Sequence, residues 1–453
     1  MITLLKKLAF KLGFNKAILF TTSGSLINAF GSIFTIIFIV RFLNGVEQGF
    51  YYTFGSLVAI QVFFELGLNG IITQYVAHET SNLKLLNDHS LEGESKYKSR
   101  LSSLLHFCVK WYLSFATALF ITLIILGFYF FNKYSSNTNQ VNWMIPWILL
   151  SLGTVMNLIL SPIIAFLQGL GEVKEIAKIQ MYQQTVRFPF LWGGLIFGAK
   201  LYVLSISCYI PLFIAVILIV SKYRILLSNI WSTNIIEKVH YRKEIFPYQW
   251  KIAVSWISGY FIFQLFNPVL FATEGPIVAG QMGMTLAALN GIFSLSFAWI
   301  TTKIPQFSGL IAQKQYSQLD NLFKTNLKQS VFINFSALTF MMIAIFTIRR
   351  FNIELVGKPL GNRFLDYFPM LCMMIPVFLN QFTASWASYL RCHKREPFLV
   401  NSLVGGVLCS FSTIILGKYF GVIGITNGYC LLTLLMFPWG YYIFSTKKVE
   451  WHV

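Results

Sequence analysis

Residues 17–40 read AILFTTSGSLINAFGSIFTIIFIV, a run without one charged side chain. An α-helix needs about 20 apolar residues to cross the hydrocarbon layer of a bilayer. Further mainly apolar stretches, some with a single charged residue, cover residues 50–76, 105–131, 143–167, 185–199, 201–221, 250–272, 281–304, 329–348, 365–389, 398–416 and 421–444. The chain is 56% hydrophobic and only 11% charged, which is too little polar surface for a water-soluble core. The sequence therefore predicts an all-α polytopic membrane protein with about 12 transmembrane helices.

The net charge of +19 is distributed unevenly along the chain. With the N-terminus inside, most of the 35 Lys and Arg residues fall on cytoplasmic connections, among them Lys6, Lys7, Lys11, Lys222, Arg224, Lys394, Arg395, Lys447 and Lys448. One outer connection disagrees, because it holds Arg349, Arg350, Lys358 and Arg363. The positive-inside bias of the other connections predicts that both termini are cytoplasmic. It also accounts for the positive charge without a nucleic-acid partner.

The two halves of the chain share short matches in the same order. Gly49 and Gly280 open the second and eighth stretches, and Thr73-Gln74-Tyr75 corresponds to Pro305-Gln306-Phe307. These matches predict a parallel repeat of two six-helix lobes around a central cavity. We place the first lobe at residues 1–222, a cytoplasmic linker at 223–247 and the second lobe at 248–453.

Polar and small residues fall on one helical face in three of the stretches. The three sets are Thr21, Ser25, Asn28, Ser32 and Thr35; Gly55, Glu65, Asn69 and Thr73; and Gly283, Ala287, Asn290, Ser294 and Thr301. Such a face indicates either a water-filled cavity or tight helix packing. Its occurrence on stretches related by the repeat favours the cavity.

Three charged residues within or beside the stretches are candidates for function. The Glu65 carboxylate would cost about 2.5–3.5 kcal/mol in the membrane unless paired or wetted. It is therefore either an ion-coupling group or part of a structural ion pair. Arg187 could bind a phosphate or anchor its helix at the headgroups. Lys303 could form an electropositive vestibule or extend to the interface.

Residues typical of catalysis or metal binding do not form a recognisable pattern. The six cysteines include no CxxC pair, the six histidines lack metal-ligand spacing, and HExxH, GxSxG and phosphate-loop motifs are absent. We therefore expect a protein that is not an enzyme, with no catalytic residue, metal or cofactor.

Three segments resemble motifs of a known transporter family. Residues 65–74 (ELGLNGIITQ) resemble the end of the second helix in polysaccharide-export flippases. Residues 169–174 (GLGEVK) resemble the turn after their fourth helix, and residues 303–308 (KIPQFS) resemble the end of their eighth. The resemblance points to the polysaccharide branch of the multidrug/oligosaccharidyl-lipid/polysaccharide (MOP) exporter superfamily, which includes O-antigen flippases.

The resemblance implies two lobes in a V around a central cavity, in the bacterial inner membrane. It implies alternating access that carries a polyprenyl-diphosphate-linked oligosaccharide to the outer leaflet for surface polysaccharide assembly. The implied partners are this lipid-linked cargo, membrane lipids and the polysaccharide polymerase machinery. The sequence departs from the family at Gln74, where a basic residue is often found.

Two other functions are compatible with the stretches. The first is a cation-coupled multidrug exporter of the same superfamily, although the first and seventh stretches lack the acidic residue common in such exporters. The second is a membrane glycan polymerase or ligase, which would need a long external loop. The longest expected one covers only about residues 349–363.

Overall fold

The computed structural model describes residues 16–85, 91–135, 141–355, 358–393 and 395–452. Lys6, Lys7, Lys11 and Lys394, which contribute to the predicted orientation, lie outside these ranges. The first half of the molecule comprises α2 (Lys16–Phe42), α3 (Gly45–Val58), η1 (Ala59–Gln61), α4 (Val62–Glu65), α5 (Leu68–Thr80), β1 (Leu83–Leu85), β2 (Leu91–Gly93), α6 (Ser95–Tyr134), α7 (Met144–Gly169), α8 (Val173–Ile196) and α9 (Tyr202–Ser232).

The second half begins after the connection that follows α9. It comprises η2 (Tyr241–Ile245), α10 (Phe246–Phe263), α11 (Phe266–Thr273), α12 (Pro276–Thr301), α13 (Ile304–Ala312), α14 (Tyr316–Arg350), β3 (Glu354–Leu355), β4 (Lys358–Pro359), η3 (Gly361–Arg363), α15 (Tyr367–Arg391) and α16 (Leu399–Trp451). Among the described residues, the strands pair as two short antiparallel sheets, β1–β2 and β3–β4.

The predicted fold class is confirmed. Within the described residues, 10 helical segments are long and apolar enough to cross a membrane. One of them, α16, contains the last two predicted stretches and kinks between them at Gly421, with φ 57° and ψ −139°. The fifth predicted stretch lies mostly on α8, which is not among the 10 and begins earlier than expected, at Val173. The chain is therefore a multi-pass helical membrane protein.

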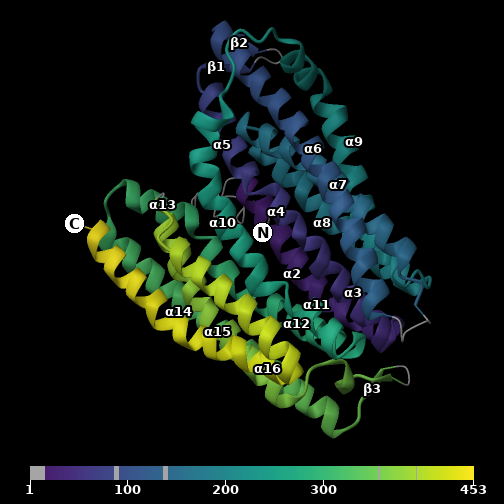
Figure 1. Cartoon of the computed structure of the whole chain (residues 1–453). Helices are drawn as coiled ribbons and strands as arrows, with labels where there is room; N and C mark the ends of the chain where they lie inside the picture. Colours follow the sequence, from purple (N-terminus) through teal and green to yellow (C-terminus); the bar gives the residue numbers. More distant parts are fainter. Residues whose placement is uncertain (1–15, 86–90, 136–140, 356–357, 394, 453) are drawn as a thin grey trace, which may run out of the picture.

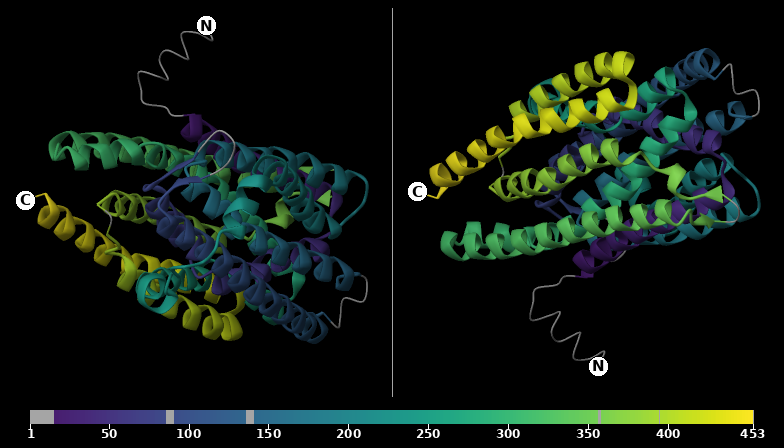
Figure 2. Two further views of the ribbon diagram at one scale, coloured as in Figure 1. Left: turned by 90° about the horizontal axis from the view of Figure 1, so that it is seen from above. Right: turned by 90° about the horizontal axis from the view of Figure 1, so that it is seen from below.

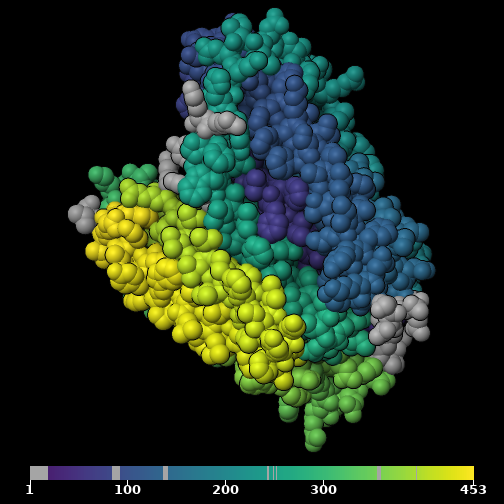
Figure 3. Space-filling view, in the orientation of Figure 1, coloured from purple at the N-terminus to yellow at the C-terminus, as the bar shows by residue number. Residues whose placement is uncertain are grey.

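The two halves are joined at one end and diverge toward the other. In Figure 1 they meet where α3, α11 and α12 lie, and they separate toward the β1–β2 hairpin on one side and the C-terminus on the other. Helix α12 packs on both α2 and α3 of the first half, and α10 packs on α4 and α5. Figure 3 shows a hollow between teal α10 and blue α6, with purple atoms of the N-terminal segment at its floor.

The segment joining the halves differs from the predicted linker. Residues 223–232 continue helix α9 to Ser232. The following backbone lies along the start of α6, where the Ser99 hydroxyl accepts hydrogen bonds from the N–H groups of Ile236 (2.7 Å) and Glu237 (2.8 Å). The segment is therefore fastened to the first half before it enters α10. The lobe boundaries stay a prediction.

Candidate functional site: a polar route between the halves

The closed end of the V is a close crossing of α3 and α12. A methyl group added to Gly49 would lie 1.9 Å from the carbonyl oxygen of Pro276, and one added to Gly280 would lie 2.9 Å from the Gly49 nitrogen. The two glycines that the repeat pairs in sequence thus lie against each other in space. Only residues without a side chain permit this approach of two backbones.

Hydrogen bonds between the halves reinforce the closed end. The Gln48 side-chain amide donates to the carbonyl oxygen of Gly280 at 2.7 Å. The Arg363 guanidinium, from the connection before α15, donates to the carbonyl oxygen of Leu43 at 2.9 Å. Both polar side chains are buried, so separating the halves here would expose groups that are satisfied only by this contact.

The polar face of α12 changes its surroundings along the helix. At the closed end, a methyl group added to Gly283 would lie 2.3 Å from Tyr52 of α3. Asn290, Ser294 and Thr301 follow on the same face about two, three and five turns later. All three are exposed. One face of α12 is thus packed against the first half at one end and open to the space between the halves along the rest.

The polar face of α2 is opposite its outer apolar face. Phe30 is two positions from both Asn28 and Ser32, which is about 200° around a helix. The exposed large apolar residues of α2 are Leu19, Leu26, Phe30, Phe34 and Ile37. The stripe of Thr21, Ser25, Asn28 and Ser32 therefore points inward, between the helices α8 and α12 that flank α2.

Two amides on these stripes are available to a ligand. Within the described residues, no hydrogen bond is present for the side chains of Asn28 and Asn290. The hydroxyls of Ser25 and Ser32 donate to the carbonyl oxygens of Thr21 (3.0 Å) and Asn28 (2.7 Å). Each hydroxyl keeps its acceptor lone pairs.

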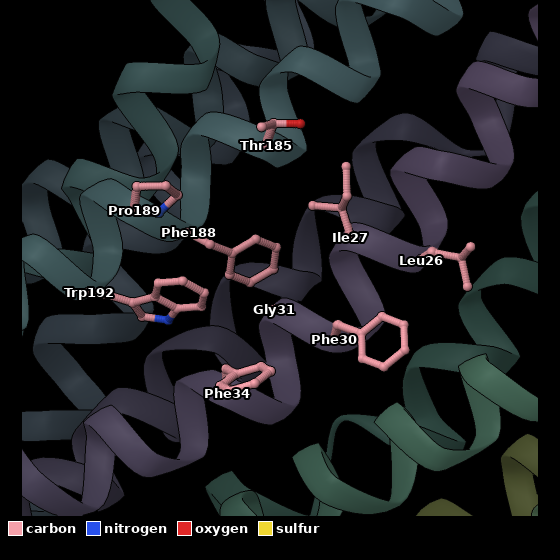
Figure 4. Close-up of a pocket in the computed structure, with 9 residues that line it drawn as sticks. All are labelled: Leu26, Ile27, Phe30, Gly31, Phe34, Thr185, Phe188, Pro189 and Trp192. Carbon is pink, nitrogen blue, oxygen red and sulfur yellow. The ribbon is translucent and has the colours of Figure 1, made fainter. Parts of the chain in front are cut away.

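Figure 4 shows a different, apolar groove where α2 meets α8. Its volume is about 340 Å³, and it is lined by Leu26, Ile27, Phe30, Gly31, Phe34, Thr185, Phe188, Pro189 and Trp192. The Phe188 ring covers Gly31, where an added methyl group would lie 2.4 Å from a ring carbon. This groove is on the outer apolar side of α2, away from the polar stripe.

The second span breaks beside Glu65, which the sequence analysis did not foresee. Leu66 (φ 51°) and Gly67 (φ 65°) are both left-handed and separate α4 from α5. A methyl group on Gly67 would lie 2.3 Å from Ile252 of α10. The break therefore lies at a contact with the second half, and the predicted continuous stripe from Gly55 to Thr73 is interrupted there.

A hydrogen-bond network joins three helices across this break. The Asn69 amide donates to the Glu65 carboxylate (2.5 Å), and the Tyr112 hydroxyl donates to the Asn69 oxygen (2.7 Å). Ser161 of α7 lies 3.5 Å from the same oxygen. Glu65 and Asn69 thus form a partly buried polar cluster within the first half. We name Glu65, Asn69, Tyr112 and Ser161 the carboxylate network.

A second network joins α12, α14 and α15, the helices of the second half that the predicted repeat relates to those of the carboxylate network. The Ser296 hydroxyl of α12 donates to the Gln381 oxygen of α15 at 3.0 Å, and Asn334 of α14 donates to Ser296 at 3.0 Å. The Ser330 hydroxyl donates to the Ser296 carbonyl oxygen at 2.6 Å. All four residues are buried. We name these four residues the amide network; neither its members nor Tyr112 and Ser161 were predicted.

The two basic candidates occupy different places. Arg187 on α8 is partly buried, and its guanidinium carbon is 5.8 Å from the centroid of the neighbouring Phe188 ring. Lys303 precedes α13, at the break that ends α12. No carboxylate lies within 4.0 Å of either side chain in the described part of the chain. The structure therefore leaves both charges available, although it does not bring them together.

An ion-pair cluster outside the spans holds the connecting segment. Arg100 of α6 contacts Glu79 of α5 at 2.9 Å and Glu244 of η2 at 2.6 Å. Burial raises the pKa of the Glu244 carboxyl, but the His240 N–H and the Arg100 guanidinium outweigh burial and leave it below the ordinary value. The sequence analysis missed this cluster because its members come from three separate segments.

Comparison with known proteins identifies the fold. No protein-family model matches the chain, and no curated protein matches it in sequence. The lipid II flippase MurJ, in an inward closed conformation, matches with a TM-score of 0.61 at 12% identity, over 96% of this chain and 90% of that chain. The MATE multidrug transporter DinF-BH matches with a TM-score of 0.58 at 13% identity, over 95% of this chain and 94% of that chain.

A third match names the superfamily. It is a multidrug resistance MATE family transporter of the MOP superfamily in an inward-facing conformation, with a TM-score of 0.55 at 13% identity, over 93% of this chain and 99% of that chain. The chain has the fold of the MOP-superfamily transporters. The expectation of a transporter fold is confirmed at this level, and the O-antigen branch stays a prediction.

Proposed function

We propose that the protein is a flippase that moves a polyprenyl-diphosphate-linked oligosaccharide across the bacterial inner membrane for surface polysaccharide assembly. The observation that carries the proposal is the inner face of α12, which is packed on α3 at Gly283 and exposed at Asn290, Ser294 and Thr301. An exposed row of amides and hydroxyls on α12, together with the inward polar stripe of α2, suits an uncharged polar cargo better than an apolar one.

The physical task explains why such rows are needed. Sugar hydroxyls lose hydrogen bonds to water in hydrocarbon, and each unsatisfied polar group costs several kcal/mol there. Amides and hydroxyls between the two halves replace those bonds, while the polyprenyl tail stays in lipid. In this proposal the cargo's sugars contact Thr21, Ser25, Asn28, Ser32, Asn69, Asn290 and Ser294.

The charged residues receive separate roles in the proposal. Arg187 and Lys303 attract the diphosphate, since both charges lack a carboxylate partner in the described residues. Glu65 is the ion-coupling group: changing its charge would alter its bond to Asn69 and, through the adjacent Leu66–Gly67 break, the contact with α10. The lobes, predicted at residues 1–222 and 248–453, would then rock relative to each other.

Alternating access requires the closed end to open. The contacts of Gln48 with Gly280 and of Arg363 with Leu43 would break as the outer side opens. With both termini in the cytoplasm, the present conformation is open to the inside. Delivery to polymerase machinery at the outer leaflet would complete the pathway.

Complementation of a deletion strain tests the proposal. We expect lipid-linked oligosaccharide to accumulate on the cytoplasmic leaflet without the protein, and the wild-type chain to restore surface glycan. Asn290→Leu combined with Ser294→Val should fail to restore it, whereas Phe340→Leu on the exposed apolar face of α14 should succeed. Normal surface glycan without accumulation in the deletion strain would contradict the proposal.

A cation-coupled multidrug exporter is the second candidate, because two of the matched structures are multidrug transporters and Glu65 is a carboxylate within a span. A drug-susceptibility panel separates the two. Broad resistance on expression, with no change in lipid-linked sugar, would favour the exporter.

A further inference from the structure

A groove between α14 and α15 combines aromatic walls with two lysines at one end. Its volume is about 480 Å³, and its walls include Phe332, Phe335, Phe378 and Phe382. Figures 1 and 2 show the two helices side by side in the second half. Phe332 is 72% exposed and Phe335 is 58% exposed, so the groove is open to the surroundings of the protein.

The lysines continue the line of the rings along α14. Lys324, Lys328 and Phe332 are spaced four residues apart, which puts them on one helical face. The apolar part of α14 begins at about residue 329. The two ammonium groups therefore lie at the membrane surface, and the rings extend from them into the hydrocarbon region.

The charge of this lysine pair is not neutralised by the protein. Among the described residues, no ion pair or hydrogen bond is present for Lys324 or Lys328. The nearest acidic residue in sequence, Asp320, is already paired with Lys448 at 2.7 Å and accepts a bond from Tyr389 at 2.5 Å. Two unpaired cations at one end of an apolar groove are complementary to a phosphate group that carries acyl chains.

We propose that this groove binds a resident anionic phospholipid, with its phosphate on Lys324 and Lys328 and its acyl chain along Phe332, Phe335 and Phe378. Basic pockets between transmembrane helices bind anionic headgroups in this way. The groove is built only from α14 and α15, so rocking of the halves would not break it. A resident lipid suits such a site better than a lipid in transit. The inference is independent of the cargo proposed above.

Native mass spectrometry of the full-length protein tests the site, with phosphatidylglycerol and phosphatidylcholine offered in turn. We expect preferential retention of phosphatidylglycerol. The Lys324→Gln/Lys328→Gln variant should lose about 10- to 30-fold in affinity for it, since each basic residue near a membrane surface contributes about three- to fivefold. Lys238→Gln/Lys314→Gln removes two exposed charges elsewhere and should leave retention unchanged.

Two further variants and one competitor complete the test. Lys324→Arg/Lys328→Arg should retain the lipid, and Phe332→Ala/Phe378→Ala should weaken retention of both lipids. Equal retention of the two lipids by the wild type, or unchanged retention by the double Gln variant, would overturn the proposal. Displacement of phosphatidylglycerol by an equal concentration of polyprenyl phosphate would assign the groove to a lipid in transit and would also overturn it.

Discussion

The carboxylate network of the first half and the amide network of the second half join corresponding helices in different ways. The first links α4–α5, α6 and α7 through Glu65 and Asn69, and it lies at a helix break. The second links α12, α14 and α15 through Ser296 and Gln381, and it lies within an unbroken part of α12.

This difference between the two networks suggests that one stabilises its helices and the other allows them to move. The amide network is uncharged and fully buried, so it fixes three helices in one arrangement. The carboxylate network can change charge, and the adjoining backbone already departs from helix geometry. The network of the first half is therefore suited to switching, and the network of the second half is suited to holding three helices rigid.

Gly67→Ala should have the largest effect on stability. A left-handed alanine costs about 1–2 kcal/mol, and its methyl group would lie 2.3 Å from Ile252, so we expect a total loss of about 2–4 kcal/mol. Gly70→Ala is the control, because nothing lies within 4 Å of its added methyl group. Thermal unfolding in detergent measures both, and equal losses would remove the special role of the break.

Gln381→Leu should destabilise the protein by about 1.5–3 kcal/mol, because it leaves the buried Ser296 and Ser330 hydroxyls without their Gln381 partner. Tyr112→Phe removes one bond from the carboxylate network and should cost about 0.6–1 kcal/mol. A chemical-denaturation series compares the two. A larger loss for Tyr112→Phe would reverse the assignment of the rigid and switching networks.

Glu65→Gln should change stability little, by less than about 1 kcal/mol, since the amide oxygen can still accept from Asn69. It should nevertheless reduce transport at least about tenfold, because the group can no longer change its charge. The control, at equal expression, is Glu172→Gln. The Glu172 carboxylate accepts a hydrogen bond from the Tyr223 hydroxyl at 2.6 Å. Equal transport by the two variants would exclude Glu65 from coupling.

The Arg100–Glu244 pair should make the thermal stability of the protein depend on pH, with a smaller effect than the substitutions above. The pKa of Glu244 is lower in the folded protein than its ordinary value of 4.5. The ionised Glu244 carboxylate therefore stabilises the folded protein at pH values above its ordinary pKa. This contribution is lost as the pH falls through the lower pKa of the folded state. Thermal unfolding between about pH 3 and 7 should show this loss in the wild type and less of it in Arg100→Gln. The same dependence in both proteins would assign it to another group.

The sequence was sufficient for the features that depend on local composition. Apolar length predicted the spans. The match of Gly49 with Gly280 predicted a repeat, but not that the two glycines meet where α3 and α12 cross. The stripes on α2 and α12 were predictable because a polar face recurs with the helical period. Their exposure at Asn290 and Ser294 depends on how far the halves diverge, which a sequence does not state.

The break and the networks were harder to predict for physical reasons. A leucine followed by a glycine in an apolar stretch is compatible with a continuous helix. The close packing of Gly67 on Ile252, at the left-handed break, is a tertiary contact that the local sequence does not show. Tyr112 and Gln381 lie in mainly apolar spans, among other polar residues. Their partners lie on other helices, so pairing them requires the helix orientations.

Cysteine labelling along α12 would show whether water reaches the space between the two halves. In a variant lacking the six native cysteines, single cysteines at Asn290, Ser294, Leu289 and Phe340 would be treated with a membrane-impermeant thiol reagent. Leu289 is fully buried and Phe340 is 72% exposed on the apolar surface of α14. We predict rapid labelling of Asn290→Cys and Ser294→Cys, with little at the other two positions. Labelling of neither Asn290→Cys nor Ser294→Cys would contradict a hydrated route between the halves.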